Sequence, residues 1–332
     1  MKKPSSITRK VLLITLTFSL LASPARADFT EGVAAYKNGE YQKAIEIFKA
    51  MATQGDARAQ FALGLMYDNG NGVEQDKKKA LEWYKAGAEN GNHKAQFNLA
   101  VLFQNGEGTE VNEAMAAYWF KQSADNGNKD AITRLHTLAE KGIPAAQFHL
   151  GNLYRSGKRL PKNLERAFSW YEKAAKQNYA RAQYNLALCY ENGDGIPRDP
   201  EQAREWYEKA ARAGIARAQY NLALILIEQG EVEQAIDWLN KAAEQGNHKA
   251  QIMFAKLYEE GKVVARDQKT AAHWYLRAAE SGDPVVQNYV GYLYAKGIGV
   301  EKDEDQAVSW FRKAAENGNL EAKENLKALD KS

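Results

Sequence analysis

All seven tryptophans of this chain fall at the same position of a repeated sequence unit. An alanine or valine marks the start of the first expected helix of each unit, and these anchors are Ala59, Ala95, Ala131, Ala146, Ala182, Ala218, Ala250, Val286 and Ala322. Successive anchors are mostly 36 residues apart, with one interval of 15 residues and one of 32 residues. A unit of this length buries its apolar face only by stacking on its neighbours. The 332 residues are therefore predicted to form one array rather than two globular domains.

Each unit has the pattern of two helices joined by a turn. In the unit of Ala182, apolar and small residues recur at helical spacing through Leu186 and Cys189, which predicts the first helix and places Cys189 in its buried face. Asp199 and Pro200 supply an N-cap and a first-turn proline for the second helix.

A glycine after the second helix closes most units, as at Gly214, and Asn178 takes this place once. Both residue types can end a helix in the left-handed conformation. The chain is thus predicted to be all-α, a right-handed α-solenoid of stacked helical hairpins. We expect the tryptophans to fill the grooves between hairpins, so that Trp206→Ala would cost about 3 to 5 kcal/mol.

The first 27 residues have the pattern of a secretory signal peptide. Basic residues precede a run of 12 apolar residues, 11–22, and a small-residue triplet ends at Ala27. Since about 20 apolar residues are needed to span a bilayer, an uncleaved anchor is the weaker alternative. We predict cleavage after Ala27 and export to the periplasm, with secretion as the alternative.

Cleavage would change the charge of the chain. The full sequence has a formal charge of +3, and removal of five basic residues leaves 40 bases against 42 acids, a net charge of −2. A nucleic-acid partner, which needs clustered basic residues, is therefore not expected. No cysteine follows the apolar run and no later stretch is long and apolar, so neither a lipid anchor nor stable membrane insertion is expected. A single cysteine also excludes an internal disulfide and a cysteine-based zinc site.

The repeated residues resemble a named family. The pattern Ala-x3-Leu-Gly-x2-Tyr, Gly-x-Gly-Val and Lys-Ala-x2-Trp-Tyr-x4-Ala is similar to the Sel-one-like repeat, the long-loop branch of the tetratricopeptide superfamily. The unit from Ala59 carries it through Leu63, Gly64, Tyr67, Gly70, Gly72, Val73, Lys79, Ala80, Trp83, Tyr84 and Ala88. The resemblance covers nearly all of residues 57–322.

Three segments depart from this pattern. The 32-residue unit from Ala218 and the N-terminal segment are closer to plain tetratricopeptide repeats, and residues 131–145 have room for only one helix. We therefore divide the chain into a signal peptide (1–27), an N-terminal tetratricopeptide-like repeat (28–58), two Sel-one-like repeats (59–130), an irregular single-helix unit (131–145), five Sel-one-like or tetratricopeptide-like repeats (146–321) and a capping helix (322–332).

The sequence carries none of the common catalytic motifs. It has no H-E-x-x-H, G-x-S-x-G, S-x-x-K or Walker pattern, and its Gly-x-Gly pairs lie between helices. His93 and His248 lie in two identical hexapeptides at turns between units, where we expect exposed side chains. No catalytic residue, cofactor or metal site is predicted. Some cysteine-rich relatives have been linked to β-lactam binding, so a cell-wall or β-lactam-directed enzyme is an alternative, against which the single cysteine counts.

A candidate partner surface comes from first-helix positions that packing does not use. In such arrays the first helices line the concave surface. In five units the residue two positions after the anchor is aromatic: Phe61, Phe97, Phe148, Tyr184 and Tyr220. In five units the residue one position before the anchor is basic: Arg58, Lys94, Arg181, Arg217 and Lys249. Three positions after the anchor are Asn98, His149, Asn185 and Asn221. From these we select Phe61, Phe97, Phe148, Arg181, Tyr184, Asn185, Arg217, Tyr220, Asn221 and Lys249 as candidate partner-binding residues. In the alternative interpretation, the aromatics pack against neighbouring units and the bases cap turns.

The resemblance implies binding of extended peptides or acidic C-termini, as in tetratricopeptide relatives. The expected function is a non-enzymatic exported adaptor or scaffold that binds a protein or peptide in the bacterial cell envelope. A secreted effector or host-interaction factor is the alternative. The sequence leaves the partner, the pathway and the oligomeric state open.

Overall fold

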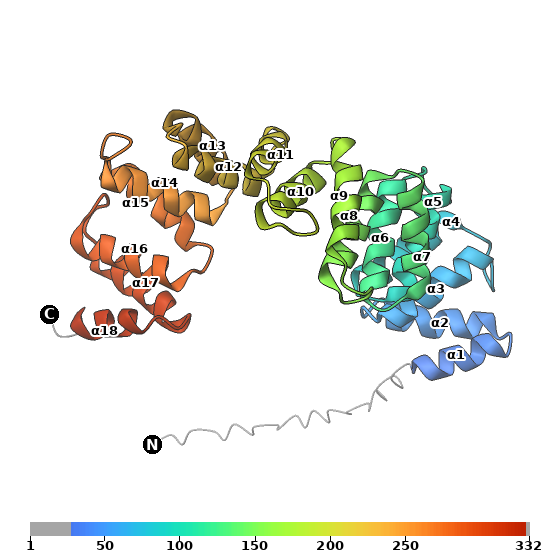
Figure 1. Ribbon diagram of the computed structural model, residues 1–332. Helices are drawn as coiled ribbons and strands as arrows, with labels where there is room; N and C mark the ends of the chain where they lie inside the picture. The colour runs from blue at the N-terminus through green and yellow to red at the C-terminus, as the bar shows by residue number, and fades with distance from the viewer. Residues whose placement is uncertain (1–27, 330–332) are drawn as a thin grey trace, which may run out of the picture. The chain divides into compact units, whose positions relative to one another are not determined.

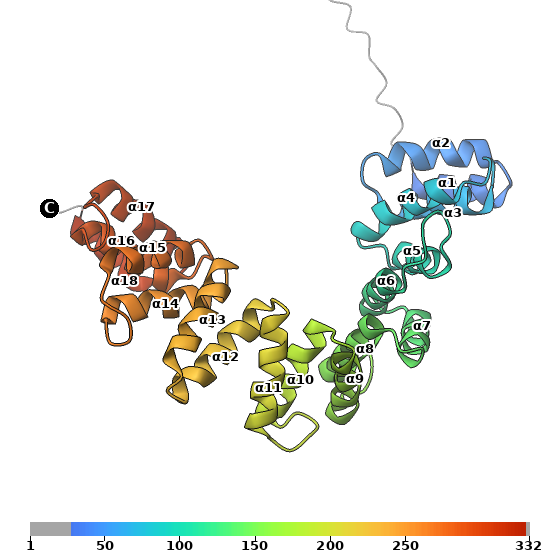
Figure 2. The same ribbon diagram turned by 90° about the horizontal axis from the view of Figure 1, so that it is seen from above.

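The computed structural model describes residues 28–329, which form 18 helices and no strand (Figures 1 and 2). The predicted signal peptide, 1–27, and the last three residues of the predicted capping helix lie outside these described residues. The chain divides into two compact units, Met1–Ala95 and Gln96–Ser332. The all-α class and the stacked hairpins of an α-solenoid are confirmed.

The first unit holds two helical hairpins and the start of a third. Its helices are α1 (Phe29–Lys37), α2 (Tyr41–Ala52), α3 (Ala57–Asn69), α4 (Lys77–Glu89) and the first residues of α5 (His93–Asn105). Helix α2 packs on α1 and on α3, and α3 packs on α4. Phe48, Leu63, Met66 and Tyr84 are fully buried among them.

The second unit continues the array from α5 to the C-terminal helix. Its helices are α6 (Glu113–Asp125), α7 (Lys129–Glu140), α8 (Pro144–Ser156), α9 (Leu164–Lys176), α10 (Ala180–Asn192), α11 (Pro200–Arg212), α12 (Ala216–Glu228), α13 (Val232–Glu244), α14 (His248–Glu260), α15 (Gln268–Ala279), α16 (Pro284–Lys296), α17 (Glu304–Glu316) and α18 (Leu320–Leu329). From α8 onward each helix packs on the next one along the chain. Cys189 is buried within α10, as predicted, and burial raises the pKa of its thiol to about 12.

Helix α7 stands where a regular unit would have two helices. It contacts both α6 and α8, and these two also contact each other directly, so that Figure 2 shows α7 to one side of them. Helix α6, the second helix of its unit, thus packs on α8, the first helix of a later unit, and only the single helix α7 lies between them in the sequence.

The turns after the second helices adopt the predicted left-handed conformation. Gly214 has a φ of 88°. The residues that close the other units also have positive φ: Gly91, Gly127, Asn178, Gly246, Gly282 and Gly318. Among the described residues, Asn178 is the only one other than glycine with a positive φ, 62°. Its side chain can adopt this conformation at lower cost than most, which explains why asparagine can replace glycine there.

The aromatic core differs from the prediction. Of the seven tryptophans, all in the described part, only Trp119 and Trp274 are buried, whereas Trp206 is partly exposed. In every unit the residue directly after the tryptophan is fully or nearly buried: Tyr84, Phe120, Tyr171, Tyr207, Leu239, Tyr275 and Phe311. The tryptophans are thus less buried than expected in most units, although Trp83, Trp206, Trp238 and Trp310 still pack against the core.

The buried aromatic ring requires a small residue on the facing first helix. An ideal Cβ on Gly64 would lie 2.4 Å from Tyr84 Cδ1, and one on Gly151 would lie 2.6 Å from Tyr171 Cε1. Since real Cβ atoms do not approach this closely, glycine at these positions allows the hairpin to close on the ring.

Candidate functional site

A groove opens between three successive first helices of the second unit. It has a volume of about 510 Å³ and is lined by α10, α12, the turn before α14 and the start of α14: Tyr184, Ala216, Arg217, Tyr220, Asn221, Gln245, Gly246, Asn247, His248 and Lys249. Five of the ten predicted partner-binding residues, Tyr184, Arg217, Tyr220, Asn221 and Lys249, thus line one groove.

The bases of this groove are available to a ligand. Arg217 and Lys249 are exposed on the first turns of α12 and α14. Within residues 28–329, neither side chain has a hydrogen-bond or ion-pair partner. Arg181, at the same position of α10, is also exposed and has no such partner in that range. Three cations without counterions therefore follow one another on successive repeats.

The aromatic residues of the groove are partly used in packing. Tyr184 is half-buried, with its ring centroid 5.9 Å from that of the buried Tyr207 on the second helix of its own hairpin. Burial raises the pKa of Tyr184, so the phenol remains neutral at physiological pH. Tyr220 is half-buried in the same way on α12. Both tyrosines thus line the groove while part of each side chain is buried.

The amides of the candidate set are partly engaged. Asn185 donates from Nδ2 to Oδ1 of Asn152, 3.2 Å away on α8, and so joins two successive first helices. Asn221 faces the hydroxyl of Tyr207, where its amide acts to lower the pKa of that phenol against the larger effect of burial. Both amides are also half-buried.

Three predicted residues lie elsewhere. Phe148 is surrounded by the rings of His149, Tyr171 and Tyr179, with centroids 5.3 to 6.2 Å away. Phe97 packs edge-on against Phe120 at 5.4 Å. Phe61 belongs to the first unit, where its ring lies 6.0 Å from that of Tyr84. For these three the packing interpretation describes what the structure shows.

His149 lies three positions after its anchor, where Asn98, Asn185 and Asn221 lie in their own units, but its environment differs from theirs. It is only 7% exposed, and its Nδ1 has no hydrogen-bond partner in the described structure. Burial lowers its pKa to about 4, with smaller contributions from the nearby charges of Lys121 and Arg181. Tyr118 of α6 lies 6.4 Å from its ring because α6 packs directly on α8 here. The direct contact between α6 and α8 therefore covers a position that is half-exposed in neighbouring units.

A buried glutamine in each repeat was not anticipated. It follows the anchor directly, as in Gln60, Gln96, Gln147, Gln183, Gln219, Gln251 and Gln287, and every one is 4 to 5% exposed. Gln219 donates from Nε2 to the Ala211 carbonyl 3.1 Å away at the end of the preceding helix. Its Oε1 accepts from Gln245 Nε2 at 2.8 Å, after the second helix of its own hairpin. A polar residue at the same place in every unit was the signal that could have revealed this bridge.

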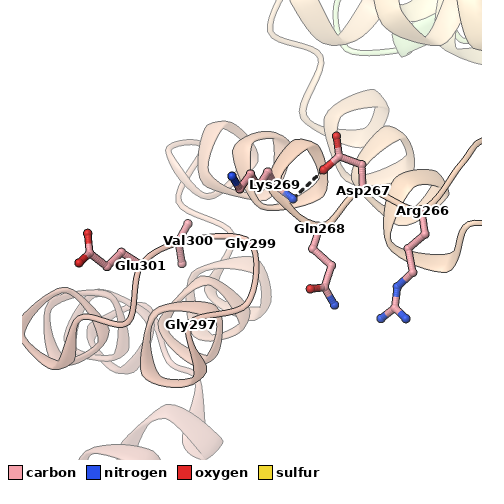
Figure 3. A pocket seen from close by; sticks show the side chains of 8 residues that line it. All are labelled: Arg266, Asp267, Gln268, Lys269, Gly297, Gly299, Val300 and Glu301. Atoms are coloured by element: carbon pink, nitrogen blue, oxygen red, sulfur yellow. Dashed lines mark hydrogen bonds between the residues drawn. The ribbon is translucent and has the colours of Figure 1, made fainter.

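A larger hollow, about 780 Å³, lies between the loops of the last repeats (Figure 3). Its residues come from 266–269 and 297–301, and Gly299 lies so close to α15 that a Cβ there would be 2.0 Å from the Gln268 carbonyl oxygen. The Asp267 carboxylate accepts from the backbone N–H of Lys269 at 2.9 Å and of Thr270 at 3.2 Å, which occupies the N-terminal donors of α15. These contacts within and between the turns give the hollow a structural explanation, and we do not take it as a candidate binding site.

Other kinds of site were sought in the described residues. Nowhere in 28–329 are three His, Cys, Asp or Glu side chains grouped so that they could hold a metal ion. None of the helices in that range has the length and apolar character needed to cross a membrane. His93 and His248 are exposed at the first residues of α5 and α14, as predicted.

Comparison with known proteins identifies the repeats. The family model described as "Sel1 repeat" matches residues 32–56, 57–92, 93–128, 144–179, 180–215, 248–283 and 284–319. The chain belongs to the Sel1 repeat family. A tetratricopeptide repeat model matches residues 198–250, which include the short unit between two Sel1 repeats. None of the curated proteins compared with the chain matches it.

One solved structure supports the same assignment by its fold, and others are similar in sequence. A Sel1 repeat protein from Oxalobacter formigenes is 32% identical, covers 92% of this chain and 88% of its own, and superposes with a TM-score of 0.56. A protective antigen of uropathogenic Escherichia coli with the same repeat fold is 30% identical over 91% of this chain and 79% of its own, with a TM-score of 0.46. A Sel1 repeat protein from Klebsiella pneumoniae is 25% identical over 60% of this chain and 99% of its own, with a TM-score of 0.37. The protein is therefore a Sel1 repeat scaffold.

Proposed function

We propose that this Sel1 repeat protein is a non-enzymatic adaptor that binds a protein or peptide partner in the groove between α10, α12 and α14. The observation that carries the proposal is the pair of exposed cations, Arg217 and Lys249, which have no counterion in the described structure and flank two half-buried tyrosines. Cations beside aromatic rings held by the fold are a common arrangement at protein interfaces.

The groove is suited to an extended segment of a partner. It is bounded by side chains of three successive repeats, so a ligand lying across it would contact all three. The tyrosine rings lose little conformational freedom on binding because Tyr184 already packs against Tyr207. The amide of Asn221 offers hydrogen bonds to a peptide backbone.

We further propose that the protein acts outside the cytoplasm, in the periplasm. This rests on the signal-peptide pattern of residues 1–27. Fractionation of cells that produce the chain with a C-terminal tag tests this location. A periplasmic, shortened product is expected, and a full-length cytoplasmic product would contradict the proposal.

The binding proposal is tested by affinity purification from the cell envelope. The variant Tyr184→Ala, Arg217→Ala, Tyr220→Ala should lose the partner that the unaltered protein captures. The matched control is Arg212→Ala on α11, where the guanidinium is already paired with Glu208 in the same helix. Unchanged capture by the triple variant, with an unaltered helical circular dichroism spectrum, would refute the groove as the binding site.

A further inference from the structure

The first helices of the last repeats carry a stripe whose chemistry changes along the array. We define the recognition stripe as the residues one position before and three and six positions after the anchor, which share one helix face because they are spaced i, i+4, i+7. Its members are Arg181, Asn185 and Leu188 on α10, Arg217, Asn221 and Leu224 on α12, Lys249, Met253 and Lys256 on α14, and Val285, Tyr289 and Tyr292 on α16.

The leading position of the stripe is cationic on three helices and apolar on the fourth. Arg181, Arg217 and Lys249 are exposed at its leading position, but α16 has Val285 there, which is 68% exposed. On the same face of α16, Tyr292 is 42% exposed and stacks on Tyr289 with ring centroids 6.1 Å apart. Val285 therefore stands where the three preceding repeats present a charge, and Tyr292 adds an exposed ring at the position of Leu188, Leu224 and Lys256.

The apolar part rests on a fixed base. The hydroxyl of Tyr275 donates to the Glu259 carboxylate at 2.7 Å, and the hydroxyl of Tyr289 donates to the other oxygen of that carboxylate. The rings of Tyr275 and Tyr289 also meet edge to face at 4.8 Å. Two donors thus satisfy the Glu259 carboxylate and hold the Tyr289 ring against which Tyr292 stacks.

The two parts of the stripe are adjacent in space. Tyr184 of α10 and Lys249 of α14 line the same groove, so α10, α12 and α14 present neighbouring surfaces. The bond from Tyr289 to Glu259 joins α14 to α16. The cationic part therefore leads directly into the apolar part within the second unit.

We infer that the recognition stripe binds an extended segment in which a block of Asp and Glu residues adjoins a block of aromatic or aliphatic residues. The acidic block pairs with Arg181, Arg217 and Lys249, and the apolar block covers Val285 and Tyr292. The stripe runs over four successive first helices, and an extended segment of about 12 residues reaches about 40 Å along it. This inference rests on the proposed function and specifies the chemistry of its partner.

The test measures binding of fluorescent peptides of about 12 residues to the whole protein by anisotropy. One peptide has an acidic block followed by a Leu, Trp and Phe block, a second has the reverse order, and a third has the same composition with acidic and apolar residues alternating. One of the two block peptides should bind at least about tenfold more tightly than the alternating peptide, because only a block arrangement satisfies both parts of the stripe.

Charge reversal and its matched controls locate the two blocks. Arg217→Glu and Val285→Glu should each weaken binding of the preferred block peptide by about tenfold. Arg312→Glu, at an exposed position of α17, and Val263→Glu, at an exposed valine in the loop before α15, should leave it unchanged. All four substitutions change exposed side chains, so a folding defect is not expected and is checked by circular dichroism.

Three outcomes would overturn the inference: equal binding of block and alternating peptides, no effect of Val285→Glu, or tighter binding of an oligothymidine of similar length than of either block peptide. The last result would show that the stripe recognises a polyanion as such. If the triple groove variant still abolished partner capture in any of these cases, the adaptor function would stand and only the partner chemistry proposed here would fall.

Discussion

The burial of the residue after each tryptophan leads to a quantitative prediction at Trp206 and Tyr207. Tyr207 is 0% exposed, and a buried aromatic ring removes about 150 to 250 Å² from water, a transfer term of about 4 to 6 kcal/mol. Its hydroxyl donates to Glu191 at 2.5 Å, which adds about 1 kcal/mol. Since alanine keeps part of the packing, Tyr207→Ala should lower the free energy of unfolding by about 4 kcal/mol.

The tryptophan beside it should matter less. Trp206 is partly exposed, and its best-defined partner is the Lys209 ammonium, 3.8 Å from the ring centroid, a contact worth about 0.5 to 1 kcal/mol at an exposed site. Trp206→Ala should therefore cost about 2 kcal/mol, less than the 3 to 5 kcal/mol expected for a fully buried ring. Urea unfolding followed by circular dichroism measures the difference between the two variants.

A control separates the ring from its hydroxyl group. Tyr207→Phe keeps the ring and should cost about 1 kcal/mol, the value of one hydrogen bond. Because stability in a repeat array is largely a nearest-neighbour property, hydrogen exchange should show the loss concentrated in α10 to α12. If Trp206→Ala proved as destabilising as Tyr207→Ala, the assignment of the core to the second residue of the pair would be wrong.

Three further changes test other parts of the fold. Gly151→Ala should lower the urea midpoint, with a cost of about 1 to 2 kcal/mol, because its Cβ would meet the Tyr171 ring at 2.6 Å despite the better helix propensity of alanine; a raised midpoint would show that the hairpin can open without cost. Asn178→Ala should cost about 1 kcal/mol at a φ of 62°, whereas Asn178→Gly should be neutral or stabilising in the same assay. The pKa of His149 is lowered to about 4 by burial, so the unfolded chain binds a proton that the folded chain does not, and stability should fall by up to about 3 kcal/mol as the pH drops from 6.5 to 4; a His149→Leu variant whose stability had the same pH dependence over this range would contradict this origin.

Most of the helical framework could be predicted from the sequence because its determinants are local. Asp199 caps α11 by accepting from the Gln202 backbone N–H, and Pro200 is the first residue of that helix, both as the sequence indicated. Gly214 and Asn178 end their helices with positive φ for the same reason. Each of these features depends on residues within one turn of the chain.

Features that depend on packing between helices could not be predicted in the same way. Trp206 and Tyr207 are both compatible with the apolar face of α11, since adjacent helix positions differ by only about 100°, and the position of α10 decides which one is buried. His149 is buried because α6 and α8 meet beside the single helix α7. Within the candidate site, the groove residues of α10, α12 and α14 came together, whereas Phe148 was drawn into contacts with Tyr171 and Tyr179.

The buried glutamine that recurs in the repeats bears on whether a whole repeat can be removed from the array. Residues 181–188 and 217–224 have the same sequence, so removing the 36 residues 183–218 would leave this sequence unbroken at the junction. Gln219 would then stand eight residues after Ala175, the carbonyl that Gln183 now uses, and would still accept from Gln245. The joined chain would be shorter by one hairpin with each of these polar contacts satisfied. Loss of one whole repeat would therefore change the length of the array while the hydrogen bonds of its buried glutamines are kept.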